Sequence, residues 1–384
     1  MKKHALLVFS AVLAAAAVSC NKENASETSF AGTEVEVGDN NGYSRLFILN
    51  EGAYPGASTL DLLDFNNKKY CSDIFGQANP EVPQGLGNTA NDMAVVDGRL
   101  WILLNASNQV AVLHLPDAKL ERVIDVECPR YITAEGKYVY VTSYGPAVYG
   151  GDPAVGKVYR FDRSSFMANS VEVGYQPEGL GVLDGKLYVA NSGGYNYVHD
   201  NRISVIDLAT FQVEKHIEAP VTNLNQMVVA GDKIWFSSYG EASWYQDGDG
   251  NWLSAVSEPM SLTSMTPGGA FTTWEGVHAE KMTVTGDVVV CIGNDAELEG
   301  GYDYCLYKVD AKGGSYMRIH FSDPYYDLSR IGYAYGLLVN GANGDIYVCD
   351  ASFTAGSKVH CFDVDLKHKW TVSTGIGTGH LLLQ

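Results

Sequence analysis

Short apolar runs separated by turn residues recur along most of the chain, and none has the spacing of a helix. The clearest unit comprises residues 186–191, a loop, and then residues 202–207. Runs rich in Val, Ile, Tyr and Trp are typical of buried strands. Relatives of the first half of this unit lie at 45–50, 99–105, 137–143, 233–238, 287–292 and 345–350. Their spacing of roughly 38 to 58 residues predicts an all-β fold, a seven-bladed β-propeller of four-stranded blades.

The two ends of the repeat complement each other. Residues 45–50 correspond to a second strand, and no inner strand precedes them. Residues 377–384 follow the seventh unit and have the pattern of the missing inner strand. We therefore expect the C-terminal strand to close the ring inside blade one, which removes an exposed sheet edge.

The N-terminus has the features of an export signal. Lys2 and Lys3 precede an apolar stretch that ends at Ser19-Cys20. Residues 1–20 resemble a bacterial lipoprotein signal peptide, in which Cys20 would be the lipidated residue. Residues 21–42 are polar and acidic and predict a flexible tether. The interpretation is then a single propeller over residues 43–384, anchored to a membrane only by lipid.

Charge narrows the set of partners. The chain has 26 basic against 45 acidic residues, a formal net charge of −19. Such a surface makes nucleic acid an improbable partner. Aspartates recur at the end of the third strand of five units, and this repetition predicts a turn cap: Asp64, Asp162, Asp207, Asp310 and Asp363.

The sequence contains no HExxH, CxxC, GxSxG or Walker motif, so it predicts no catalytic residue and no cofactor. The one metal-like spacing is that of a calcium loop, formed by Asp247, Asp249, Asn251 and Glu258. Trp252 occupies the place where such a loop requires glycine, which favours a solvated hairpin tip over a calcium site.

One face of the propeller is expected to bind a ligand. The loops between second and third strands, and the connections between blades, share a face and are long and aromatic. They contribute Tyr54, Tyr144, Tyr149, Tyr195, Tyr197, Tyr239, Trp244, Tyr245, Trp252, Trp274 and Phe353. Half of these rings would serve only to order the loops. A polar column at the start of the inner strands would surround the channel mouth: Asn91, Glu178, Asn225, Glu280, Tyr335 and His380. The same column could instead hold ordered water.

The phrases KLYVAN at 186–191 and RISVIDLATFQVEKHIEA at 202–219 resemble the YVTN repeat of the YncE-like and surface-layer propellers. With the lipoprotein start and the phrase Leu49-Asn50-Glu51-Gly52, the chain also resembles Bacteroidota surface propellers. Among these, the BtuG type captures corrinoids such as vitamin B12 for an outer-membrane transporter. The resemblance implies a non-enzymatic lipoprotein exposed on the outer membrane, with a corrinoid-like ligand and a transporter partner.

Two other classes of function remain open. A surface-layer or adhesin module would need only the propeller and its tether. A propeller enzyme of the lyase or quinoprotein kind would need a metal or cofactor cluster, which the sequence does not display.

Overall fold

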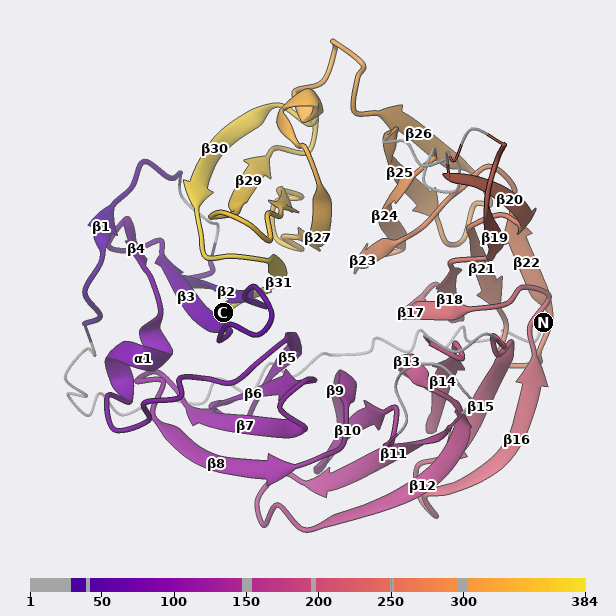
Figure 1. Ribbon diagram of the computed structural model, residues 1–384, viewed down its shortest axis with the longest axis horizontal. Coiled ribbons are helices and arrows are strands. Elements are labelled where there is room, and N and C mark those ends of the chain that lie inside the picture. Colours follow the sequence, from indigo (N-terminus) through magenta and orange to yellow (C-terminus); the bar gives the residue numbers. More distant parts are fainter. Residues whose placement is uncertain are drawn as a thin grey trace, which may run out of the picture.

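The computed structural model describes residues 29–38, 42–146, 154–194, 198–248, 250, 252–295 and 303–384. Within these residues the chain forms seven antiparallel sheets of at least four strands each, arranged around a central axis (Figure 1). The fold is the seven-bladed β-propeller that the repeat predicts.

Each blade runs from an inner strand at the axis to an outer strand at the rim. Blade two contains β5 (Ala90–Val96), β6 (Arg99–Leu104), β7 (Gln109–His114) and β8 (Leu120–Asp125). Blade three contains β9 (Pro129–Glu135), β10 (Tyr138–Ser143), β11 (Val155–Asp162) and β12 (Ala168–Tyr175). Blade four contains β13 (Pro177–Leu183), β14 (Lys186–Asn191), β15 (Arg202–Asp207) and β16 (Gln212–Glu218).

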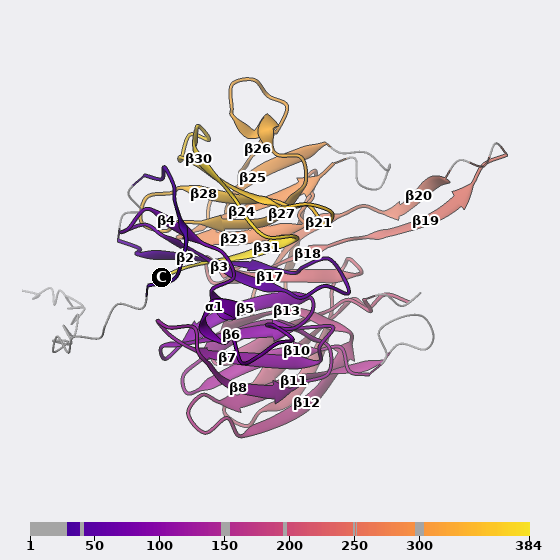
Figure 2. The same cartoon turned by 60° about the vertical axis from the view of Figure 1, so that its left-hand side comes forward.

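Blade five carries an additional hairpin. Its four strands are β17 (Leu224–Ala230), β18 (Lys233–Ser238), β21 (Ser261–Met265) and β22 (Phe271–Trp274). The hairpin between β18 and β21 consists of β19 (Glu241–Gln246) and β20 (Trp252–Glu258). Figure 2 shows this hairpin projecting away from the ring.

Blade six contains β23 (Lys281–Thr285), β24 (Val288–Asn294), β25 (Tyr304–Asp310) and β26 (Tyr316–His320). Blade seven contains β27 (Ala334–Val339), β28 (Ile346–Asp350), β29 (Lys358–Phe362) and β30 (His368–Ser373). The described helices are short: α1 (Ile74–Ala78) and the 3-10 turn η2 (Leu328–Arg330). Among the described residues no helix is long and apolar enough to cross a membrane.

Blade one is built from both ends of the chain. The C-terminal strand β31 (Thr378–Leu383) is its inner strand, followed by β2 (Arg45–Asn50), β3 (Thr59–Asp64) and β4 (Lys69–Cys71). The register between β31 and β2 runs from Leu383 opposite Leu46 to Thr378 opposite Asn50. The expected ring closure is therefore confirmed.

Residues 29–38, part of the predicted tether, lie along blade one. Strand β1 (Thr33–Glu34) pairs with the outer strand β4 as a fifth strand. Phe30 and Val37 on either side of β1 are buried against the blade. Val35 packs against the same apolar cluster as Val37, and the open edge of β4 supplies backbone hydrogen bonds, so both contacts hold the segment there.

The hydrophobic core is divided among the interfaces between blades. Each of seven apolar clusters draws its residues mainly from two adjacent blades. Trp101 of blade two, for example, packs against Phe161 of blade three, with ring centroids 5.9 Å apart. The second strands are buried on both faces because each sheet lies between two others, which explains their continuous apolar runs.

The repeated aspartates act as predicted. Asp162 accepts hydrogen bonds from the backbone N–H groups of Ser164 and Ser165, at 3.1 and 2.9 Å. Asp64, Asp207, Asp310 and Asp363 make equivalent contacts with the turns that follow them. These short turns hold the third and fourth strands in register and leave the opposite face free for longer loops.

Candidate ligand-binding site at the channel mouth

A recurrent β-bulge directs polar side chains into the central channel. In β5, β9, β13, β17, β27 and β31, one extra residue near the start of the strand lies opposite the second strand of the blade. A bulge re-aims the side chains next to it, so neighbouring residues can both face the axis. Arg130 and Tyr131 show this, because both line the same cavity.

This cavity has a volume of about 420 Å³ and opens at the ends where the inner strands begin. That is within the range of small-molecule sites, roughly 300 to 1,000 Å³. Its lining consists of Glu51, Asn91, Arg130, Tyr131, Tyr144, Glu178, Ser192, Gly194, Asn223, Asn225, Tyr239, Met260, Lys281, Tyr335 and His380.

An ion pair between Arg130 and Glu178 forms one wall. The guanidinium group donates from Nε and Nη2 to the two carboxylate oxygens, at 2.9 and 3.1 Å, and both side chains are largely buried. Arg130 also donates to Asn91 Oδ1 at 2.6 Å, and the Tyr144 hydroxyl donates to Glu178. The Tyr144 ring lies 4.7 Å from the guanidinium carbon. A bidentate pair with these supports fixes the wall geometrically.

A second polar group lies across the mouth. The Tyr335 hydroxyl donates to Glu51 Oε1 at 2.8 Å, and the Lys281 ammonium lies 4.4 Å from the centre of the Tyr335 ring. Burial raises the pKa of Glu51, although the Tyr335 hydrogen bond opposes this. Burial lowers the pKa of Lys281 despite the nearby carboxylates. Lys281 Nζ donates no hydrogen bond to any described residue, so its cation faces the cavity beside the Tyr335 ring and is attracted by the carboxylates of Glu280 and Glu51.

Asn225 is the second incompletely satisfied group in the cavity. The residue is only 6% exposed, and its Oδ1 has no hydrogen-bond partner among the described residues. A buried carboxamide oxygen without a partner is costly, which makes such a group a candidate contact for a bound molecule. Tyr239 lines the same cavity, and burial raises its pKa well above the ordinary value.

The channel continues below the mouth into a second cavity of about 220 Å³. Lys281, Tyr335, Tyr131 and His380 line both cavities. In the lower one, burial raises the pKa of Asp92 to about 7 and lowers that of His380 to about 3. Asp92 Oδ1 lies 3.8 Å from His380 Nδ1. At neutral pH His380 is therefore uncharged and Asp92 is only partly ionised, as expected for a narrow and poorly solvated channel.

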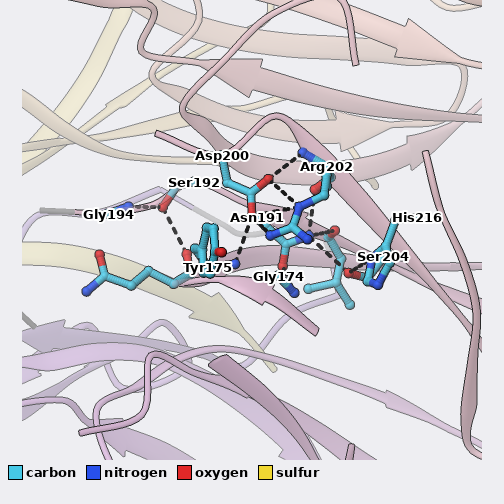
Figure 3. A network of polar contacts seen from close by, with 11 residues as sticks. Gly174, Tyr175, Asn191, Ser192, Gly194, Asp200, Arg202, Ser204 and His216 are labelled. Carbon is cyan, nitrogen blue, oxygen red and sulfur yellow. Dashed lines mark hydrogen bonds and ion pairs between the residues drawn. The ribbon is translucent and has the colours of Figure 1, made fainter. Parts of the chain in front are cut away.

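The loop of blade four that reaches the mouth is held by a polar network (Figure 3). Asp200 accepts hydrogen bonds from the backbone of Tyr175 at 2.8 Å and forms an ion pair with Arg202 at 2.6 Å. Ser192 donates to the Gln176 carbonyl at 2.9 Å and accepts from the Gly194 N–H at 2.7 Å. The cavity wall at Ser192 and Gly194 is thus fixed by the blade beneath it.

The structure brings together most of the predicted polar column. Asn91, Glu178, Asn225, Tyr335 and His380 all line the mouth, as do the predicted aromatic residues Tyr144 and Tyr239. His380 lies one residue deeper in its strand than the others, because Gly379 occupies the bulge position of β31 and His380 follows it.

Glu280 does not line the cavity. Its Oε1 accepts the backbone N–H of Asn294 at 3.0 Å, and Lys281 contributes to the lining instead. A single residue step along β23 thus replaces the expected carboxylate with a cation. Trp274 is also displaced from its expected position in a connection. It lies in the outer strand β22, with its ring centroid 5.3 Å from that of Trp235.

Other predicted aromatic residues lie outside the cavity lining. Phe353 contacts the Tyr335 ring edge to face, with centroids 5.3 Å apart. Tyr54 is 79% exposed in the loop between β2 and β3, and Tyr245 is exposed on β19. Tyr149, Tyr195 and Tyr197, and the side chains of Trp244 and Trp252, lie outside the described residues, as do Cys20 and the signal sequence.

The calcium spacing is described only in part, because Asp249 and Asn251 lie outside the described residues. Glu258, the last member of the spacing, directs its carboxylate to Thr222. It accepts the Thr222 backbone N–H at 2.7 Å and its hydroxyl at 3.2 Å. The Glu258 carboxylate therefore caps the neighbouring blade connection.

Sequence reasoning missed Arg130, Tyr131, Glu51 and Lys281. Arg130 and Tyr131 could have been predicted from the repeat. They occupy the same positions in blade three as Glu178 and Gly179 in blade four. Glu51 belongs to the phrase Leu49-Asn50-Glu51-Gly52, which drew attention only as a resemblance. The partnership of Glu51 with Tyr335, 284 residues away, has no local signal.

Comparisons with known proteins support the fold. No protein-family model matches the chain, and no curated protein matches it. Among solved structures, Kuenenia stuttgartiensis hydrazine synthase has a TM-score of 0.56 and 15% identity, over 75% of this chain and 87% of that one. Apo AztD from Citrobacter koseri has a TM-score of 0.53 and 13% identity, over 88% of this chain and 97% of that one. At such identities these likenesses establish the fold class alone.

Proposed function

We propose that this protein binds a small polar molecule with a ring system at the channel mouth and releases it chemically unchanged. The observation that carries the proposal is the pair of incompletely satisfied groups in the cavity wall, the Lys281 ammonium and the buried Asn225 carboxamide. A ligand that offers an acceptor to the cation and an N–H or O–H group to the amide oxygen would satisfy both. A ring-bound carboxamide offers both groups, whereas a ring-bound carboxylate offers the acceptor and needs a separate N–H or O–H substituent as the donor.

The aromatic lining supports the same ligand class. Tyr131, Tyr239 and Tyr335 contribute aromatic rings with polar hydroxyls to the lining, which suit a flat ligand that carries polar substituents. The Tyr144 ring is buried and packs on Arg130. Glu178 favours binding over turnover, since its carboxylate is already engaged by Arg130 and Tyr144. A general base needs its lone pairs available to the substrate.

A corrinoid, the ligand that the sequence resemblance implies, is larger than the 420 Å³ cavity and would have to lie across the mouth. One of its peripheral amide side chains could then reach Lys281 and Asn225. We therefore propose corrinoids as one candidate and smaller ring-bearing amides and acids as the other. The exposed Phe353 and Tyr54 lie in loops of the same face, where a broad ligand would contact them.

Anchoring at the outer membrane through Cys20 and delivery to a transporter belong to the same proposal. Residues 29–38 lie along the outer strand of blade one, whereas the cavity is lined mainly by inner strands and the loops above them. A lipid anchor attached through this segment would hold the propeller at its edge and leave the mouth accessible.

Native mass spectrometry and calorimetry with vitamin B12 and a panel of ring-bearing amides and carboxylates test the proposal. Lys281→Met should weaken binding about ten- to a hundredfold, the effect of losing one hydrogen bond to a charged group. Lys215→Met, on the exposed outer strand β16, is the matched control and should bind like wild type. Folding of Lys281→Met should be unimpaired, because burial already disfavours the charge.

Two results would contradict the proposal. One is equal affinity of wild type and Lys281→Met for every probe that binds. The other is a change in the mass of a bound probe during incubation, which would favour the propeller-enzyme alternative. If the protein binds whole surface polymers but none of the small probes, the surface-layer or adhesin alternative is favoured.

A further inference from the structure

A second cluster of reactive side chains lies in blade six, apart from the channel mouth. Asp295 directly follows β24, Cys305 lies on β25 and His320 ends β26. Cys305 and His320 are cross-strand partners in the sheet register. The backbone N–H of Asp295 donates to the Asp303 carbonyl at 2.9 Å, which closes the base of the loop between β24 and β25. Three adjacent strands thus bring a carboxylate, a thiol and an imidazole to one end of the blade.

The donor atoms converge on one point. Cys305 Sγ lies 3.2 Å from Asp295 Oδ2 and 3.3 Å from His320 Nδ1, and all three donors lie within 4.8 Å of one another. In a tetrahedral zinc site, the bond lengths to sulfur, nitrogen and oxygen place the donors roughly 3.3 to 3.6 Å apart. The two separations that involve Cys305 Sγ are therefore close to the spacing of metal ligands, and the third is within 4.8 Å.

The surroundings orient the carboxylate. The Tyr307 hydroxyl donates to Asp295 Oδ1 at 2.6 Å, and His278 Nδ1 contacts the same oxygen at 2.9 Å. This leaves Oδ2 directed at Cys305. Supports of this kind around a ligating carboxylate are typical of metal sites. Cys305 is fully buried, whereas the His320 side chain is 43% exposed, so an ion could enter from the solvent side.

Arg318 is the cation that these groups hold in the structure. Its Nη2 forms an ion pair with Asp295 Oδ2, and its Nε donates to Cys305 Sγ at 3.4 Å. Positive charge is thus already favoured at this point. The side chain of Arg318 is 38% exposed and could turn into solvent when another cation takes its place.

We propose that Asp295, Cys305 and His320 form a binding site for a divalent transition metal ion of the zinc type, for which Arg318 competes. The thiol S–H bond breaks as the sulfur–metal bond forms, and the proton leaves to solvent. His320 coordinates through the Nδ1 lone pair of its neutral ring, and Asp295 through an ionised oxygen. Water fills the fourth position. Thiolate and imidazole ligands select zinc-like ions over calcium and magnesium.

The test uses the full-length protein without a polyhistidine tag, kept reduced and titrated with Co²⁺ and then Zn²⁺. We expect one equivalent of Co²⁺ to produce a near-ultraviolet thiolate-to-cobalt absorption band, which Zn²⁺ then removes. Cys305→Ser should abolish the band, and His320→Ala should weaken Zn²⁺ binding at least tenfold in competition with a chromophoric chelator. Arg318→Met should bind Zn²⁺ as tightly as wild type or more tightly.

Cys349→Ser is the matched control, because Cys349 is equally buried but lies on β28 in blade seven. It should keep the band. Absence of the band in both wild type and Arg318→Met would overturn the proposal and leave the cluster as an ion-pair network around Asp295. A band that persists in Cys305→Ser would also overturn it. If Cys305→Ser fails to fold, His320→Ala tests the site instead, because the His320 side chain is partly exposed. Unchanged Zn²⁺ affinity in that variant would contradict the site.

Discussion

Replacing one member of the Arg130–Glu178 ion pair should show how completely water is excluded from the channel mouth. Arg130 and Glu178 are 13% and 4% exposed, and two hydrogen bonds join them. Removing one member of a buried pair strands the other charge and typically costs about 3 to 5 kcal/mol. Tyr144 still donates to Glu178 in Arg130→Met, so we expect about 3 kcal/mol, at the low end of this range.

The double variant Arg130→Met/Glu178→Met separates the pair energy from lost packing. Replacing a buried pair with apolar side chains of similar volume is often close to neutral. We therefore expect the double variant to be more stable than Arg130→Met alone, with a coupling energy of about 3 kcal/mol in the thermodynamic cycle. Urea unfolding at neutral pH measures all four proteins.

The result that would refute this reasoning is a cost below about 1 kcal/mol for each single variant, with additive effects in the double variant. Such values are typical of solvated surface ion pairs. They would mean that water fills the mouth and that Lys281 and Asn225 are satisfied by solvent, which would also weaken the proposed ligand site.

Three further predictions concern other parts of the molecule. Burial raises the pKa of Asp92 to about 7, above its value in the unfolded chain. The stability that Asp92 contributes is therefore complete below the unfolded pKa and is lost as the pH rises through 7. The pKa of His380 is lowered, so its contribution has the opposite pH dependence. The free energy of unfolding of Asp92→Asn should therefore rise relative to that of wild type between pH 4 and pH 8, by at most about 4 kcal/mol in urea titrations. A difference that does not change with pH would contradict the raised pKa of Asp92. Deleting residues 377–384 removes the inner strand of blade one and should abolish a cooperative melting transition in circular dichroism, whereas an unchanged transition would refute the role of ring closure. Cys20→Ser should move the protein from the membrane to the soluble fraction, and continued membrane partitioning of the exported variant would count against lipidation.

The sequence determined the architecture because the signals for it are local and repeated. Seven apolar runs bounded by turn residues fix the strands, and in five blades the aspartate at the end of the third strand fixes the turn that follows. Ring closure could also be predicted, since the first unit lacks an inner strand and the C-terminus supplies one. Four members of the polar column, Asn91, Glu178, Asn225 and Tyr335, could be located by repeat register alone.

The chemistry of the mouth was decided only by the tertiary structure. Arg130 meets Glu178 from 48 residues away, and Glu51 meets Tyr335 from 284 residues away. The exchange of Glu280 for Lys281 depends on a one-residue step in register, which inverts the charge presented to the cavity. The repeat spacing determines the position of a residue along its strand. The direction of a side chain near a bulge and the contacts across the channel axis depend on how all seven blades pack together.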